Sequence, residues 1–119
     1  MSDFVTLKSN GDFRRLYNRG KVVTDPALVV YYSKNRAGIC RIGITTSKKI
    51  GNAVERNRSR RVIKAAFVSL VKDIEPCYDF VFVARSKTKF VKSTRIAEIM
   101  RKIMLDDGII KTASDSDEG

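Results

Sequence analysis

The sequence predicts a single α/β domain. Runs rich in β-branched and aromatic residues, at 27–32, 39–47 and 80–84, predict strands. They alternate with longer segments whose apolar residues recur every three or four positions, as they do in helices. A chain of 119 residues can bury one hydrophobic core but not two. No internal repeat or linker interrupts the alternation, so we expect one domain over residues 1–111.

A short helix is predicted near the N-terminus. Ser9 or Asn10 can cap its start, and Gly20 is well placed to end it. Phe13 and Tyr17 are four residues apart and therefore share one face of this helix. Either both rings pack into the core, or one of them lines an exposed groove in which bases could stack.

Two strands follow in the predicted order. Residues 27–32, ALVVYY, form a strand with two apolar faces, so the sheet is either covered on both sides or leaves one apolar face open for binding. The two faces are Ala27, Val29 and Tyr31 on one side, and Leu28, Val30 and Tyr32 on the other. Residues 33–38 are typical of a hairpin loop, and 39–47 form the next strand, in which Gly43 indicates a bulge or a close approach.

The C-terminal part contains a short apolar strand at 80–84, which we expect to be central, then a basic loop and a last helix at about 93–105. The inward face of that helix is predicted to carry Ile96, Ile99 or Met100, and Ile103. The acidic segment TASDSDEG, residues 112–119, lacks apolar anchors and predicts a disordered tail.

The segment from Lys48 to Phe67 predicts a strongly basic helix. It holds seven Lys or Arg residues against a single acid, Glu55, which stands three residues after the N-cap Asn52 in the capping-box position. One side of the helix is apolar and consists of Val62, Ile63, Ala66, Phe67 and Leu70, with the small Ser59 above them. The opposite side consists of Asn57, Arg60, Arg61 and Lys64.

Two interpretations of this basic side are open. It can be a solvated surface, as most charge runs are. However, its cations repel one another at roughly a few tenths of a kcal/mol per pair, which favours a polyanionic partner. The net charge of +11 and the isoelectric point near 10.0 point to the same partners, namely RNA, DNA or an anionic membrane.

Other features of the composition exclude several kinds of site. The chain has no histidine, which removes the commonest general base. Cys40 and Cys77 are far apart in the sequence and predict neither a zinc site nor a disulfide, and the thirteen acids form no evident metal-binding set. We therefore expect no metal site in the protein. Neither a signal peptide nor an apolar run of about 20 residues is evident, so a cytoplasmic protein is expected.

The segment SKKIGNAVERNRSRRVIKAAF, residues 47–67, resembles the RNR signature of the bacterial ribonuclease P protein subunit. An early F-x-x-x-Y followed by a glycine, a V-V-Y strand, R-I-G-I-T before the signature and F-V-F-V-A-R after it stand in the same order as in that family. The resemblance covers about residues 10–105. The chain departs from the family at Ser59, where a larger residue is common, at Lys64, where Arg is frequent, and in its acidic tail.

The resemblance implies the protein subunit of ribonuclease P, a ribonucleoprotein endonuclease that removes the 5′ leader from precursor tRNA. It also implies that the RNA subunit is the catalyst, that Mg²⁺ is bound mainly by that RNA, and that no catalytic residue lies in the protein. The implied partners are the ribonuclease P RNA and the precursor leader, with neither a membrane nor a small-molecule substrate. Two alternatives are open. One is a structural RNA-binding protein of the ribosomal type, without a role in cleavage. The other is a self-sufficient nuclease, which would need a metal-binding set of carboxylates that is not evident in the sequence.

The resemblance also implies a fold and two sets of site residues. The fold is a two-layer α/β sandwich with a central four-stranded mixed sheet, helices on one face and a left-handed βαβ crossover. Residues implied to contact the catalytic RNA are Arg56, Asn57, Arg58, Arg60, Arg61 and Lys64, together with Lys48 and Lys49. Residues implied to form the leader-binding cleft are Phe13, Tyr17, Val29, Tyr31, Thr45, Lys87 and Lys89.

Overall fold

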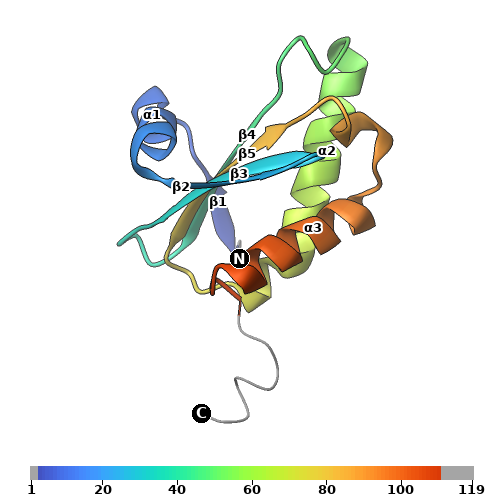
Figure 1. The fold of residues 1–119 in the computed structure, drawn as a ribbon. Coiled ribbons are helices and arrows are strands. Elements are labelled where there is room, and N and C mark those ends of the chain that lie inside the picture. Colours follow the sequence, from blue (N-terminus) through green and yellow to red (C-terminus); the bar gives the residue numbers. More distant parts are fainter. Residues whose placement is uncertain (1–2, 111–119) are drawn as a thin grey trace.

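The computed structural model describes residues 3–110, which form a five-stranded mixed sheet with helices on both faces (Figure 1). The elements in chain order are β1 (Phe4–Thr6), α1 (Asn10–Arg19), β2 (Lys21–Asp25), β3 (Leu28–Lys34), β4 (Cys40–Thr45), α2 (Ala53–Leu70), the 3₁₀ turn η1 (Val71–Asp73), β5 (Tyr78–Ala84), the 3₁₀ turn η2 (Thr88–Phe90) and α3 (Ser93–Asp106). The predicted α/β class is confirmed. The predicted tail lies outside the described residues.

The order of the strands in the sheet is β1-β4-β5-β3-β2. Strand β4 is parallel to both of its neighbours, β1 and β5, whereas β3 is antiparallel to both β5 and β2. The sheet is therefore mixed, as expected, but it has five strands and not four. The two unpredicted strands include β1, which is only three residues long, and β2 at the opposite edge. The hand of the crossover through α2 stays a prediction.

Strands β3 and β4 do not form the hairpin that the loop at 33–38 predicted. Strand β5 lies between them, so that Phe82 pairs with Val30 of β3 on one side and with Ile44 of β4 on the other. The physical reason is burial. Six of the seven β5 residues are buried, all except Val83, and a strand that is buried on both faces is most stable at the centre of a sheet. The prediction that this strand is central is confirmed.

The main core lies between the sheet and the pair α2 and α3. Phe67 of α2 is fully buried, and its ring meets Phe80 and Phe82 of β5 at centroid distances of 5.7 and 5.6 Å. Phe4 of β1 contacts the same ring edge-on at 5.3 Å. The predicted inward residues of α3 are all buried, namely Ile96, Ile99, Met100 and Ile103. No helix among residues 3–110 is long and apolar enough to span a membrane.

Helix α1 lies on the opposite face of the sheet from α2 and α3 (Figure 1). The expectation of helices on one face only is therefore wrong. Leu16 of α1 is fully buried in a second, smaller cluster with Leu7 and Val81. Because α1 has only ten residues, it covers just part of this face. The remainder of the face stays open.

The ends of α1 follow from local chemistry. Ser9 is the N-cap, and its hydroxyl accepts a hydrogen bond of 3.1 Å from the Gly11 amide, as predicted. Gly20 ends the helix in an extended conformation, with φ −73° and ψ 160°, and not in the left-handed cap expected of a glycine. A Cβ at this position would lie 2.6 Å from the Leu16 carbonyl oxygen and 3.0 Å from that of Tyr32. The glycine therefore permits a close approach of α1 to β3.

Candidate nucleic-acid interface

Helix α2 begins with the predicted capping box. The Asn52 side chain accepts a hydrogen bond of 2.9 Å from the Glu55 amide, and the Glu55 carboxylate accepts one of 3.1 Å from the Asn52 amide. Two contacts hold the pKa of Glu55 below its usual range: the hydrogen bond from the Asn52 backbone, which has the larger effect, and the contact with Lys89. The carboxylate therefore stays ionised at the positive end of the helix dipole.

We call the eight residues implied to contact the catalytic RNA the basic face: Lys48, Lys49, Arg56, Asn57, Arg58, Arg60, Arg61 and Lys64. All of them are exposed except Arg56, which is half-buried. Among the described residues, neither Arg61 nor Lys64 has a hydrogen-bond or ion-pair partner. On the predicted apolar side of α2, Ile63, Ala66, Phe67 and Leu70 are buried and Val62 is half-buried. Ser59 is also buried, and its hydroxyl donates to the Glu55 carbonyl at 3.1 Å.

Three arginines of the basic face donate to backbone carbonyls. The guanidinium of Arg56 lies 2.8 Å from the Gly51 carbonyl oxygen, and that of Arg60 lies 3.0 Å from the Ile44 carbonyl oxygen. Arg58 donates to the backbone of the loop between β5 and α3. These bonds hold the side chains in place but neutralise none of their charge, since a carbonyl is neutral. The face can therefore still attract phosphates.

Lys48 and Lys49 belong to the turn that joins β4 to α2. Both side chains are exposed, while the following Ile50 is buried in the main core. The Ile50 amide bonds the Ser47 carbonyl at 3.0 Å, which closes the turn. The two lysines thereby extend the positive charge of α2 beyond its N-terminus.

The second region, which we call the cleft, is the part of the sheet beside α1. Because neighbouring strands are in register, side chains of one face stand in rows across the sheet. One row is Thr45, Val83, Val29 and Thr24, and the next is Gly43, Val81, Tyr31 and Val22. Helix α1 packs over Val81, which is fully buried, whereas Val29, Tyr31 and Thr45 are half-buried. The structure thus brings three predicted cleft residues to one face.

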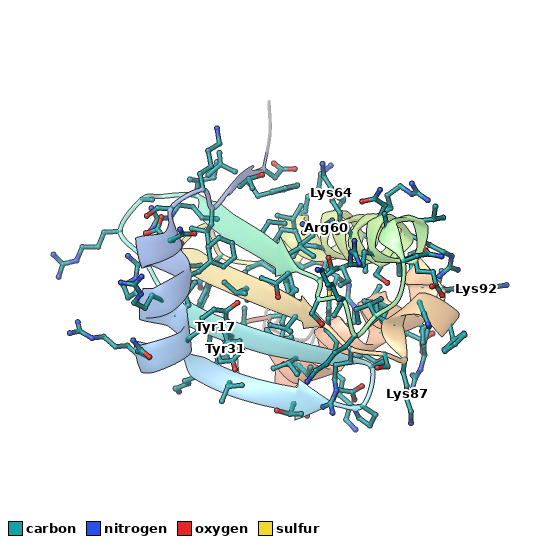
Figure 2. The ribbon with its side chains drawn as sticks, turned by 90° about the horizontal axis from the view of Figure 1, so that it is seen from above. Tyr17, Tyr31, Arg60, Lys64, Lys87 and Lys92 are labelled. Carbon is teal, nitrogen blue, oxygen red and sulfur yellow. The ribbon has the colours of Figure 1, made fainter. Side chains whose placement is uncertain are left out.

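Helix α1 adds two aromatic rings to the cleft. Tyr17 is 42% exposed, and its ring meets that of Tyr31 edge-on at a centroid distance of 4.9 Å (Figure 2). Phe13 is half-buried and lies directly on Gly43, where an added Cβ would be 2.4 Å from the ring. The close approach predicted at Gly43 is therefore confirmed. Of the two alternatives for the rings, Phe13 packs mainly inward and Tyr17 lines an open surface.

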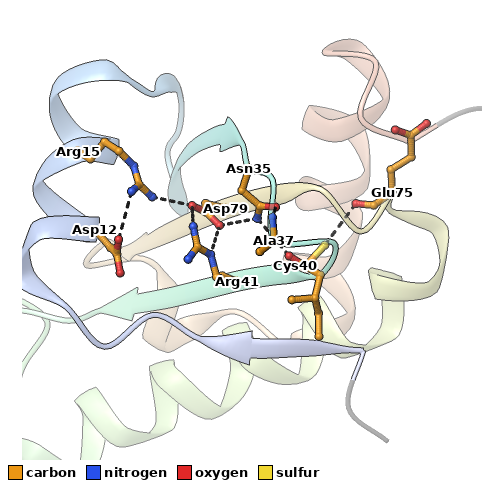
Figure 3. A network of polar contacts seen from close by, with 9 residues as sticks. Asp12, Arg15, Asn35, Ala37, Cys40, Arg41, Glu75 and Asp79 are labelled. Carbon is orange, nitrogen blue, oxygen red and sulfur yellow. Dashed lines mark hydrogen bonds and ion pairs between the residues drawn. The ribbon is translucent and has the colours of Figure 1, made fainter.

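A buried carboxylate fixes α1 to the sheet (Figure 3). Asp79 of β5 is fully buried and accepts hydrogen bonds of 2.7 Å from Arg15, 2.8 Å from both Nε and Nη2 of Arg41, and 2.7 Å from the side-chain Nδ2 of Asn35. Arg15 also reaches Asp12 at 3.2 Å. The hydrogen bond with Asp79 raises the pKa of Arg41 further above its ordinary value. The network therefore ties together α1, β4, β5 and the loop after β3.

Basic face and cleft border a shared groove of about 470 Å³. Strand β1 pairs with β4 only as far as Ile42, so the outer edge of β4 beyond that point has no neighbouring strand among the described residues. The groove lies there, lined by Phe13 and Gly43 from the cleft and by Arg60, Arg61 and Lys64 from the basic face. One strand of nucleic acid could follow this groove from one region to the other.

Two lysines implied for the cleft lie elsewhere. The Lys89 ammonium is 3.1 Å from the Glu55 carboxylate, so this side chain lies beside α2. Lys87 is exposed in the turn before η2, and Figure 2 shows it well apart from Tyr17 and Tyr31. Neither lysine joins the aromatic pair in this structure.

Several residues of the cleft carried no sequence signal that singled them out. Val22 is 52% exposed on β2 and continues the row of Tyr31, but β2 itself was not predicted. Two consecutive β-branched residues, Val22 and Val23, could have indicated this strand. Nothing in the sequence around Asp79 indicated that its side chain is buried, because its arginine partners are 64 and 38 residues away.

Among residues 3–110, no group of three or more Cys, Asp or Glu could hold a metal ion.

The family model and the known proteins that match this sequence all carry the name ribonuclease P. A family model for Ribonuclease P matches residues 1–106. The ribonuclease P protein component of Clostridioides difficile (strain 630) is 45% identical over 84 residues, which are 70% of this chain and 74% of that protein. The component from Thermoanaerobacter sp. (strain X514) is 37% identical over 101 residues, or 85% of this chain and 87% of the relative.

Solved structures agree with these relatives. The Staphylococcus aureus RNase P protein has a TM-score of 0.78 and 31% identity, and the match covers 89% of this chain and 97% of that one. The RNase P protein from Thermotoga maritima has a TM-score of 0.73 and 25% identity, covering 82% and 93% of the two chains. The fold is therefore that of the matched structures.

Proposed function

Because this chain belongs to the ribonuclease P protein family, we propose that it is the protein subunit of a ribonucleoprotein endonuclease that removes the 5′ leader from precursor tRNA. The basic face binds the catalytic RNA, and the cleft binds the single-stranded leader. The observation that carries this proposal is the pairing of two chemically different surfaces on one small domain, joined by a groove that both of them line.

The basic face suits a folded RNA rich in phosphates. Arg61 and Lys64 have no partner among the described residues, and the only acid nearby on α2, Glu55, is already paired with Lys89. Cations of this kind bind phosphates by releasing the counterions condensed on the RNA. Arginine can also donate two parallel hydrogen bonds to one phosphate, so the arginines orient the RNA as well as attract it.

The cleft suits a single strand without fixed sequence. Tyr17 and Tyr31 present aromatic edges and faces, and Val29 and Thr45 extend the surface with small side chains. Stacking of a base on an aromatic ring is worth roughly 1–3 kcal/mol and is tolerant of base identity. Such a surface would bind leaders that differ from one precursor tRNA to another.

In this proposal, the RNA subunit catalyses the phosphodiester cleavage and the protein does not. The protein has no histidine, and we propose that the Mg²⁺ ions used for phosphodiester cleavage are held mainly by the RNA subunit. The protein then acts by adding substrate affinity through the leader and by reducing repulsion between the phosphates of two RNAs. This neutralisation lets the RNA enzyme work at lower Mg²⁺ concentrations.

The test is cleavage of 5′-labelled precursor tRNA by a bacterial ribonuclease P RNA at low Mg²⁺, with and without this protein, and by the protein alone. We expect cleavage at the mature 5′ end only when RNA and protein are both present. Cleavage by the protein alone would contradict the assignment of catalysis to the RNA. Tight RNA binding with no effect on cleavage, also with the RNA from the protein's own source, would instead favour a structural, ribosomal-type protein.

A further inference from the structure

Phe90 is the most exposed large apolar side chain among the described residues, at 79%. It ends the 3₁₀ turn η2, in the basic loop between β5 and α3. A single exposed apolar residue is ordinary on a protein surface. This one differs because three lysines stand within three residues of it, namely Lys87, Lys89 and Lys92.

The turn that carries Phe90 is rigidly anchored. Thr88 is fully buried; its hydroxyl donates a hydrogen bond of 2.6 Å to the Ala27 carbonyl and accepts one of 2.9 Å from the Arg85 amide. The Phe90 amide bonds the Lys87 carbonyl at 3.1 Å. The backbone that carries the ring is therefore ordered before a ligand binds, so that binding costs little backbone entropy.

The same turn is tied to the basic face. Arg58 of α2 donates to the Lys89 carbonyl, and the Lys89 ammonium lies 3.1 Å from the Glu55 carboxylate. That ammonium also lies 5.2 Å from the centroid of the Phe90 ring. One side of the ring thus has a cation beside it, while most of the ring area remains open to solvent. Figure 2 shows Lys87 and Lys92 at this end of the molecule.

We propose that Phe90 is a stacking platform for one unstacked nucleobase of the RNA that the basic face binds, with Arg58 and Lys92 on the flanking phosphates. The inference rests on the proposed function and extends its RNA-binding surface from α2 to the η2 turn. An aromatic ring among cations is the chemistry that single-stranded nucleic acid requires. The occupant is assigned to the catalytic RNA and not to the leader, because the turn is bonded to α2 and Tyr17 lies on the other face of the sheet.

The experiment measures the affinity of the full-length protein for ribonuclease P RNA over a series of salt concentrations. Phe90→Ala should weaken binding roughly 5- to 150-fold, the range expected for one stacked base, with no change in salt dependence because no charge is lost. Phe90→Tyr keeps the ring and should bind like the wild type. Val68→Ala, which trims an apolar residue that is 50% exposed on α2, is the matched control and should also bind like the wild type.

Arg61→Ala separates this inference from the proposed function. It should weaken binding and reduce the slope of log K against log salt by about one. If Arg61→Ala weakens binding but Phe90→Ala does not, the stacking inference fails and the proposed function stands. If the wild-type protein does not bind the RNA at all, both fail.

A second measurement tests whether Phe90 contacts the catalytic RNA or the precursor leader. The reconstituted enzyme is assayed for its preference for precursor over mature tRNA. Phe90→Ala should leave this preference unchanged, whereas Tyr17→Ala should reduce it. A Phe90→Ala variant that loses only leader preference, with normal affinity for the catalytic RNA, would overturn the assignment.

Discussion

The basic face and the cleft are built in opposite ways. Six of the eight residues of the basic face come from one continuous stretch of α2, and nearly all project into solvent. The cleft is assembled from α1, β3 and β4, and its rings are packed against the sheet and each other. Binding by the first region should therefore depend on individual charges, whereas binding by the second depends on how α1 is held. Three predictions test this difference, from the largest effect to the smallest.

The buried carboxylate under α1 should dominate stability. Asp79→Ala leaves Arg15 and Arg41 without their shared partner, and breaking a buried ion pair in this way costs about 3–5 kcal/mol. We expect that loss in the free energy of unfolding, measured by urea denaturation. Where the variant is still folded, leader affinity should fall more than affinity for the catalytic RNA.

The matched control for that variant is an exposed ion pair on the other side of the molecule. Asp73 lies 3.0 Å from Arg101, and its side chain is 54% exposed. Asp73→Ala should cost no more than about 1 kcal/mol, because solvent screens surface pairs. Equal losses in the free energy of unfolding for the two variants would contradict the prediction that the buried network around Asp79 dominates stability.

A single ring in the cleft should have an intermediate effect. Tyr31→Ala removes a half-buried stacking surface, so binding of precursor tRNA should weaken by roughly 1–3 kcal/mol, while binding of mature tRNA is unchanged. Tyr31→Phe keeps the ring and serves as the control. The reconstituted enzyme would be titrated with both tRNAs, and equal losses for precursor and mature tRNA would contradict a leader site at Tyr31.

The smallest effect concerns the one acid of the basic helix. Because the folded state lowers the pKa of Glu55, its ionised form adds stability at pH values above the unfolded-state pKa. That contribution disappears as the pH falls through the lower, folded-state pKa. The stability advantage of the wild type over Glu55→Gln should therefore shrink on acidification, as measured by thermal unfolding between neutral and acidic pH. An advantage that is independent of pH would exclude a role for the charge.

The comparison also explains what the sequence could predict. The start of α2 depends on residues three positions apart, Asn52 and Glu55, and its two faces follow from helical periodicity. Helical periodicity therefore placed Asn57, Arg60, Arg61 and Lys64 together on one side of α2, and all four are exposed there. The binding of RNA by this side stays a prediction. The predicted strands at 27–32 and 80–84 also lie close to the observed bounds of β3 and β5, because both strands are rich in β-branched and aromatic residues.

What could not be predicted depends on contacts between distant parts of the chain. The loop at 33–38 has the composition of a hairpin, but only the insertion of β5 decides that β3 and β4 are apart. Strand β1 is too short to show a period, and β2 is an edge strand with no buried residue. The resemblance implied that Lys89 lies in the cleft, whereas its ion pair with Glu55 holds it beside α2.

The central position of β5 has a consequence for how the chain is made. Strand β5 is the last of the five strands in the sequence, yet it joins the two halves of the sheet. While the ribosome is still synthesising the chain, β1 with β4 and β2 with β3 can form only two separate ribbons, each with an open inner edge. Such edges are sites of aggregation. A chain truncated before Tyr78 should therefore aggregate, although it already contains the whole basic helix.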